Sequence, residues 1–232
     1  MLLPLLDKLN SKSIILASAS ANRKQILEKS GLVFTQSPST FEENMPHSDF
    51  ATSIDYVVKN TEMKFLNKLT EIKQKLEQSD NTSVVEFADI IIAADTIISL
   101  DGKQIVEKPL DKSHAFQMLM KYNDYEYHEV QTAVVIGFIN RDTAQIINQQ
   151  TLVDITKVYF EKIDEATAMA YVESGEPFGK AGGYGIQGQA ATLIKKIEGD
   201  YYNVWGFPLN RFCSKIKEML QEIDQQEELK QQ

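Results

Sequence analysis

Blocks of apolar and polar residues along the chain predict a mixture of strands and helices. The run from Ser13 to Ala17 is apolar, as a buried strand is, and residues 20–27 after it have the pattern of a helix capped by a serine. Gly31 is expected to end that helix, and residues 32–35 to form a second strand. The chain therefore opens with an expected strand, serine-rich turn, helix and strand.

The middle of the chain predicts a long helix at about residues 50–78, a polar surface loop at 78–86 and a strand at 88–94. That strand is apolar nearly throughout, which is typical of a strand covered on both faces. A separate hairpin is expected over residues 96–106, because an Asp-Gly pair that suits a two-residue turn lies at its centre.

The second half of the chain predicts a helix at residues 111–122, followed by two long β-rich runs at 127–139 and 144–159. The short polar link between these runs favours an antiparallel pair that extends the sheet. A further helix is expected at residues 163–174, and a final amphipathic helix begins near Phe207.

Together these elements predict one α/β domain over residues 1–223, with an elongated mixed sheet flanked by helices. We expect two lobes with a central cleft between them. Residues 224–232 are rich in Gln and Glu and are predicted to be a frayed, solvated tail rather than a binding element.

Composition and charge limit the kinds of ligand and partner that the chain is expected to bind. The 232 residues include 24 Lys and Arg against 33 Asp and Glu, a net charge of −9, so we expect no stable nucleic-acid partner and only a local cluster of basic groups for any anion. The apolar run from Met1 to Leu6 is too short for a membrane span or a signal peptide, which predicts a cytoplasmic protein without membrane contact. The single Cys213 excludes a disulfide framework.

Several polar residues stand where a ligand could be held. Asp95 directly follows the apolar strand, and ligand-binding groups emerge at the carboxyl ends of such strands. Ser18 and Ser20 lie in a strand-to-helix turn that could cradle a phosphate, and Lys108 precedes a proline that fixes the local backbone. Each residue also has a plain structural interpretation, as a turn cap, a helix cap or a solvated lysine.

Other chemistries are disfavoured. The three histidines lack the spacing of zinc ligands, and the chain has no Walker loop and no nucleophile elbow. The glycine-rich run KAGGYGIQG at residues 180–188 allows a ligand to approach the backbone closely, although it could equally be an ordinary glycine loop.

Four blocks in order along the chain resemble the Maf family of nucleoside triphosphate pyrophosphatases. These blocks are LASASANRKQIL, IIAADTIISLDGKQIVEKPLDKSHAFQMLM, SGEPFGKAGGYGIQG and DYYNVWGFPLNRFC, which span roughly residues 14 to 213. The last block is especially similar to Maf domains that eukaryotes join to a methyltransferase-like half. The resemblance implies a fold similar to that of inosine triphosphate pyrophosphatase.

The resemblance also implies the site residues. It gives Asp95, Lys108, Arg23 and Lys64 catalytic roles, although Lys59 and Lys68 lie near enough to compete with Lys64. It implies metal ligation by Glu43 and Asp95, with Mg²⁺ or Mn²⁺ as the divalent cation. The substrate-binding residues that it implies are Ser18, Ser20, Thr96, Lys180 and Gln187.

Three positions depart from the family pattern. Asn22 replaces the first arginine of the opening block and Ala21 its proline, while Gly179 replaces the usual aspartate before Lys180. Loss of an arginine removes a fixed charge and a bidentate phosphate donor, which is expected to lower activity or to shift substrate preference.

The implied reaction is hydrolysis of a nucleoside triphosphate, from the dTTP, UTP and modified-pyrimidine branch of the family, to a monophosphate and pyrophosphate. Gln187 is the expected base contact, because an amide both donates and accepts; the alternative is that it only stabilises its loop. A second hypothesis is a non-catalytic nucleotide-binding regulator linked to cell division and septum formation. The sequence leaves a homodimer open.

Overall fold

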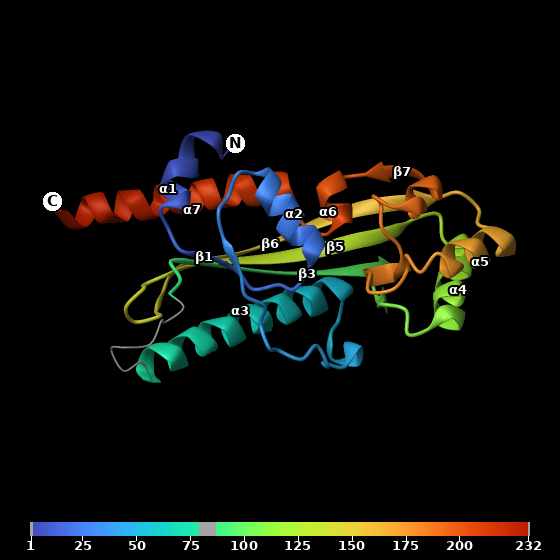
Figure 1. Cartoon of the computed structure of the whole chain (residues 1–232), viewed down its shortest axis with the longest axis horizontal. Coiled ribbons are helices and arrows are strands. Elements are labelled where there is room, and N and C mark those ends of the chain that lie inside the picture. Colours follow the sequence, from blue (N-terminus) through green and yellow to red (C-terminus); the bar gives the residue numbers. More distant parts are fainter. Residues whose placement is uncertain (1, 79–86, 232) are drawn as a thin grey trace.

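The computed structural model describes residues 2–78 and 87–231, so most of the predicted polar loop at 78–86 lies outside the described residues. Within them, a seven-stranded mixed sheet runs along the length of an elongated molecule (Figure 1). Its strand order is β2-β1-β3-β5-β6-β7, with β4 paired to β3. The strands are β1 (Ile14–Leu16), β2 (Thr35–Gln36), β3 (Ile90–Leu100), β4 (Gln104–Val106), β5 (His128–Ile139), β6 (Ile146–Phe160) and β7 (Ile194–Glu198).

Helices cover both faces of this sheet, as predicted (Figure 1). The α-helices are α1 (Leu6–Asn10), α2 (Ala21–Lys29), α3 (Ser53–Gln78), α4 (Lys112–Lys121), α5 (Glu165–Glu173), α6 (Tyr201–Trp205) and α7 (Leu209–Gln231). Short 3-10 helices are η1 (Leu3–Leu5), η2 (His47–Asp49), η3 (Tyr122–Asp124), η4 (Ala181–Gly183) and η5 (Gln189–Thr192).

Strand β3 shows how the sheet separates two cores. Its side chains alternate between faces, as in any strand. Ile90 and Ile92 pack with α2, α6 and α7, whereas Ile91 packs with Phe65 and other residues of α3 on the opposite face. A third core lies at the end of the sheet that carries α4 and α5, around Val158. The predicted two-lobed mixed α/β fold is thus confirmed.

Helix α3 owes its position to one stripe of buried residues. They recur every three or four positions, which places them along one side of a helix. The stripe packs against the sheet and contains both polar and apolar residues: Ser53, Tyr56, Val57, Asn60, Thr61, Lys64, Phe65, Lys68 and Ile72. Buried polar side chains in such a stripe need partners across the interface, which is where the candidate site lies.

Two boundaries differ from the sequence-based expectation. Strand β3 is one continuous strand from Ile90 to Leu100, whereas the sequence predicts two separate strands over this stretch. The strand continues through Asp95 because Lys64 of α3 pairs with this carboxylate inside the protein. Helix α7 runs to Gln231, past residue 224, where the sequence predicts a frayed tail, and Asp224 there forms an ion pair with Lys8.

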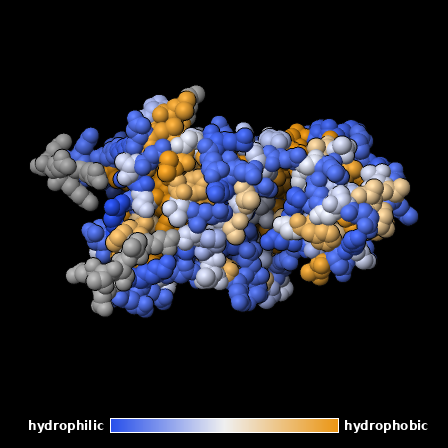
Figure 2. All heavy atoms as spheres, viewed as in Figure 1, coloured by the Kyte–Doolittle hydropathy of each residue, from blue (hydrophilic) through white to orange (hydrophobic). Residues whose placement is uncertain are grey.

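The surface in Figure 2 is mostly hydrophilic, with hydrophobic residues in small separate groups. Among the described residues, none of the helices has the length and apolar character needed to cross a bilayer.

Candidate active site

The site begins at a fork along one edge of β3. On that edge β1 pairs in parallel with residues 90–92, and β4 pairs antiparallel with residues 98–100. The stretch between the two pairings, residues 93–97, therefore borders the space where the neighbouring strands diverge. Asp95 and Thr96 lie in this stretch, and because they are adjacent in a strand they project to opposite faces of the sheet.

A cavity of about 810 Å³ opens at this fork and reaches both faces. Every residue that the sequence nominated for the site lies along its lining: Ser18, Ser20, Arg23, Glu43, Lys64, Asp95, Thr96, Lys108, Lys180 and Gln187. Asn22 and Gly179, two of the departures from the family pattern, line it as well. Segments far apart in the sequence thus converge at the fork, while the roles of the individual residues remain predictions.

On the α3 face, four side chains form what we call the carboxylate cluster: Glu43, Asn60, Lys64 and Asp95. The Lys64 ammonium lies 2.7 Å from Glu43 Oε1 and 2.8 Å from Asp95 Oδ1. The Asn60 amide Nδ2 donates to Asp95 Oδ2 at 2.6 Å and to Glu43 Oε2 at 3.2 Å. Each of the four carboxylate oxygens is therefore contacted by one side-chain nitrogen of α3 and keeps a further lone pair.

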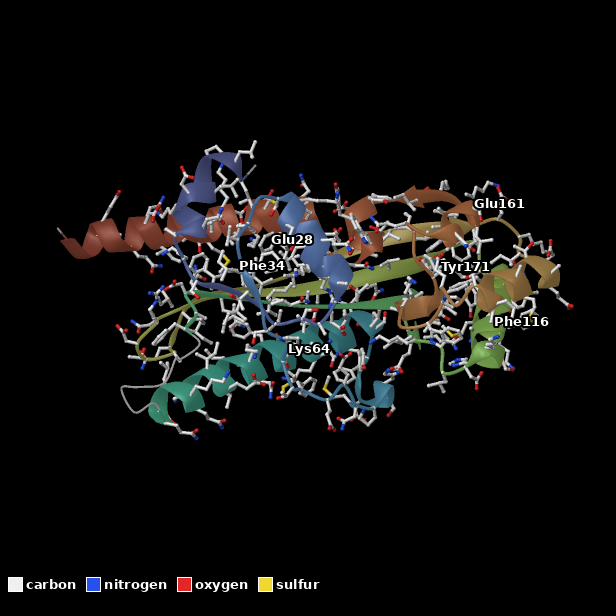
Figure 3. The ribbon with its side chains drawn as sticks, viewed as in Figure 1. Glu28, Phe34, Lys64, Phe116, Glu161 and Tyr171 are labelled. Atoms are coloured by element: carbon white, nitrogen blue, oxygen red, sulfur yellow. The ribbon has the colours of Figure 1, made fainter. Side chains whose placement is uncertain are left out.

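Lys64 is the lysine of α3 that reaches the cavity (Figure 3). The competing Lys59 lies on the surface beside Glu62, and Lys68 is buried but bonds Glu71 and Ser37. The spacing that suggested Lys64 therefore selects the lysine that pairs with Asp95.

On the opposite face, Arg23 ties three segments together. Its guanidinium donates to Ser18 Oγ at 2.8 Å, to Thr96 Oγ1 at 3.0 Å and to the Gly206 carbonyl at 3.0 Å. Burial lowers the pKa of Arg23, and the negative charge of Asp95 opposes that shift. An arginine stays protonated in proteins, so this one contributes a fixed positive charge to the cavity.

The glycine-rich loop is held by Glu176, a residue that sequence reasoning missed. Its carboxylate accepts from the backbone N–H of Gln189 at 2.7 Å, and its backbone carbonyl accepts from Lys180. A side chain at Gly188 would meet this carboxylate at 2.1 Å, so only glycine allows the close approach. Glu176 thereby fixes the backbone just after Gln187 and holds the side chain of Lys180.

A second group of side chains, which we call the aromatic cluster, lies next to the cavity on the side of β5 and reaches it through Tyr184: Tyr122, His128, Phe160 and Tyr184. His128 lies 2.7 Å from the Tyr184 hydroxyl, and its ring packs 4.3 Å from the Tyr122 ring centre. Burial lowers the pKa of His128 to about 3, so the imidazole is neutral near pH 7. Tyr184 borders the cavity, which makes this cluster an uncharged wall.

Sequence reasoning placed Asp95 correctly at the cavity but for a wrong reason. The residue was expected at the end of a strand, whereas it lies in the middle of β3, opposite Ala133 of β5. The cavity exists because the neighbouring strands end, not because β3 does. Asn60 was also missed, since an asparagine among the polar residues of a long helix gives no signal until its position relative to Lys64, four residues later, is considered.

Several known proteins are similar to this chain over most of its length. The chain is 39% identical, over 93% of its length, to a human protein named "Probable bifunctional dTTP/UTP pyrophosphatase/methyltransferase protein", and spans 33% of that protein. It is 37% identical to the dTTP/UTP pyrophosphatase of Halalkalibacterium halodurans, covering 89% of this chain and 95% of that one.

Among solved structures, a HAM1 protein from Coxiella burnetii covers 89% of this chain and 99% of its own, at 14% identity and a TM-score of 0.45. A family model described as Maf-like protein matches residues 13–219, a span that contains the fork, the carboxylate cluster and the glycine-rich loop. The chain therefore belongs to the Maf family.

Proposed function

We propose that this protein hydrolyses dTTP, UTP and related pyrimidine nucleoside triphosphates to the monophosphate and pyrophosphate. The observation that carries the proposal is the paired carboxylates of Glu43 and Asp95, fixed by Lys64 in a cavity that Arg23 and Lys108 also line. Relatives that match nearly the whole chain are named dTTP/UTP pyrophosphatases. The alternative of a non-catalytic regulator is not favoured.

The proposed reaction is attack of water on the α phosphorus. A new bond forms between the water oxygen and the α phosphorus, and the bond from that phosphorus to the bridging oxygen breaks, so that the bridging oxygen leaves with pyrophosphate. The side chain of Asp95 is 9% exposed and each of its oxygens keeps a lone pair, so it is placed to accept the proton from the water.

The basic residues of the cavity would bind the phosphates. Arg23 is rigidly held by three bonds, while Lys108 and Lys180 line the cavity on other sides. Positive groups around a leaving pyrophosphate stabilise the charge that builds on it as the bond breaks. These residues form the local basic cluster that a chain of net charge −9 needs to hold a triphosphate.

The residues present also fit a divalent cation. Glu43 and Asp95 offer the oxygen ligands that Mg²⁺ and Mn²⁺ prefer, and the amide of Asn60 holds one oxygen of each carboxylate in place. No group of three or more His, Cys, Asp or Glu side chains suited to a metal occurs in the described part of the chain, so the two carboxylates would bind the cation with water in the free protein, and the substrate phosphates would complete its ligands. When bound, such a cation would neutralise charge on the phosphates.

The wider proposal is that residues 1–223 act as one domain in the cytoplasm and that Gln187 contacts the base. Gln187 lines the cavity beside the backbone that Glu176 holds. A side-chain amide at this position can pair with the edge of a pyrimidine as donor and acceptor at once. Gln187→Ala should therefore lose preference for dTTP and UTP over purine nucleotides more than it loses overall rate.

The test is a nucleotide panel with the purified chain in Mg²⁺ and in Mn²⁺. Products should be separated by ion-exchange chromatography, so that monophosphate with pyrophosphate is distinguished from diphosphate with phosphate. We expect release of pyrophosphate, fastest with dTTP or UTP. Release of phosphate and diphosphate, or no turnover of any nucleotide, would contradict the proposal. Light scattering of the same preparation decides between a monomer and a homodimer.

A further inference from the structure

Asn60 of α3 is fully buried and polar and does not line the cavity, yet its amide bonds both carboxylates of the carboxylate cluster. It lies one helical turn before Lys64, so the two side chains project from the same side of α3. Lys64 bonds one oxygen of each carboxylate in the carboxylate cluster, and Asn60 bonds the other oxygen of each. The helix therefore grips Glu43 and Asp95 at two points instead of one.

The two carboxylates differ in how firmly the fold holds them. Asp95 belongs to the central strand of the sheet, and its side chain is 9% exposed. Glu43 belongs to a segment without regular structure between β2 and η2, and its side chain is 41% exposed. Two negative groups at close range repel each other, and the ammonium of Lys64 in contact with both offsets that repulsion only in part. Glu43 is the carboxylate that would swing away if a tether were lost.

We propose that Asn60 is a positioning residue that holds the Glu43 carboxylate beside Asp95 and thereby sets the affinity of this pair for a divalent cation. The proposal rests on the proposed function, because it assigns Asn60 to the same site. Its chemistry follows from that of outer-shell groups generally: a neutral donor that orients a ligand contributes to metal affinity without touching the metal.

The chain offers a matched control in Asn203. This asparagine is also fully buried, its Nδ2 also makes two hydrogen bonds, at 3.0 Å to the Val130 carbonyl and 3.0 Å to Thr156 Oγ1, and its Oδ1 is likewise unpaired in the described residues. The two asparagines differ in their hydrogen-bond acceptors, which are uncharged groups for Asn203 and carboxylates for Asn60. Substitution by leucine removes comparable bonds at both sites.

The experiment is a titration of the nucleotide-free protein with Mn²⁺, with free Mn²⁺ measured by electron paramagnetic resonance. Asn60→Leu should weaken Mn²⁺ binding at least about tenfold, the range typical for loss of an outer-shell partner. Asn203→Leu should lose thermal stability to a similar degree and keep the wild-type affinity. Equal affinity in wild type and Asn60→Leu, or equal weakening in both leucine variants, would overturn the proposal.

A double-mutant cycle tests whether Asn60 acts through Glu43. In a Glu43→Gln background the carboxylate that Asn60 is proposed to position is gone, so adding Asn60→Leu should weaken Mn²⁺ binding much less than it does in the wild-type background. Additive effects of the two substitutions would show that Asn60 does not act by this route. If Asn60→Leu fails to fold, Asn60→Ser keeps one donor in a smaller side chain and should weaken binding by an intermediate factor; wild-type affinity in that variant would count against the tether.

Turnover of dTTP by the same samples separates this inference from the proposed function. Wild-type protein that hydrolyses dTTP while Asn60→Leu binds Mn²⁺ normally would refute the role of Asn60 alone. Wild-type protein that binds Mn²⁺ through the tethered pair but hydrolyses no nucleotide would refute the proposed function alone.

Discussion

The carboxylate cluster and the aromatic cluster border the same cavity but meet the cost of burial in opposite ways. In the first, the ammonium of Lys64 forms ion pairs with Asp95 and Glu43, and the amide of Asn60 donates to the other oxygen of each carboxylate. In the second, burial lowers the pKa of His128 to about 3 and raises that of Tyr184, so both side chains are neutral. An isolated buried charge is too costly to keep, so a fold must either pair it or neutralise it.

This difference suggests a chemical role for the carboxylate cluster and a structural role for the aromatic cluster. A cluster that keeps its charges can hold a cation or take up a proton, provided that it stays open to the cavity. A cluster of neutral rings can only shape a wall, but it does so rigidly, because its members pack edge to face and share a hydrogen bond. We expect perturbation of the first cluster to act on turnover and perturbation of the second to act on stability.

Removal of divalent cations should have the largest effect on turnover. If Glu43 and Asp95 hold Mg²⁺ or Mn²⁺, excess chelator should abolish pyrophosphate release, and either cation should restore it. The melting temperature should change little, because Lys64 still pairs both carboxylates when the cation is gone. Full activity in excess chelator would show that turnover does not depend on a cation bound by Glu43 and Asp95.

Asp95→Asn should come next. The substitution keeps the shape but removes the proton acceptor, and general-base assistance is worth about 10² to 10⁴ in rate, so kcat should fall at least that far. Nucleotide Kd should change much less, because Arg23 and Lys108 still line the cavity. The matched control is Asp89→Asn, which breaks an ion pair with Arg141 just before the same strand. Comparable loss of kcat in both variants would mean that Asp95 acts only through the fold.

Lys64→Met should reduce stability as well as turnover. The lysine is 8% exposed, and its loss leaves Asp95 and Glu43 facing each other without the ammonium that contacts both. Removing one partner of a buried pair costs about 3 to 5 kcal/mol, less here because Glu43 is partly exposed. Denaturant unfolding should show that the double variant with Asp95→Asn loses less than the sum of the two single losses.

The control for this prediction is Lys68→Met, one turn further along α3. Lys68 is as buried as Lys64 but pairs with Glu71, outside the residues that line the cavity. It should lower stability with little effect on kcat. Equal loss of kcat from both lysine substitutions would show that α3 matters only as a packing element.

The smallest predicted effect concerns His128 and pH. Its pKa is about 3 in the folded protein and ~6.5 in an unfolded chain, so between these values the unfolded state binds the extra proton. The contribution of His128 to the free energy of unfolding is therefore largest above pH 6.5 and is lost as the pH falls toward 3. Between pH 7 and pH 5 this loss amounts to about 2 kcal/mol. His128→Gln should flatten that part of the profile in urea unfolding, whereas His114→Gln should not. An unchanged slope in His128→Gln would show that the aromatic cluster does not exclude charge.

The sequence foretold most of the elements, since the patterns of α3, β5 and β6 are long and regular. It failed where tertiary pairing overrides a local signal: the charge of Asp95 looked like the end of a strand because its partners lie 35 and 31 positions away in the chain. The Glu176 contacts to the glycine-rich loop were invisible for a related reason. Glycine marks that a backbone approach occurs but does not name what approaches.

The pairing of β3 with β5, from Ile90 opposite Phe138 to Ser99 opposite Glu129, has a consequence for how this chain can vary. Because side chains alternate between faces, inserting or deleting a single residue in β3 before Asp95 would turn this carboxylate toward Arg23 and Thr96 toward Lys64. Changes of length should therefore accumulate in the turn between β5 and β6, where residues 140–145 connect the strands at the surface. Strand β3 can accept substitutions but no change in length, so we expect the spacing within β3 to be kept wherever Asp95 and Thr96 are kept.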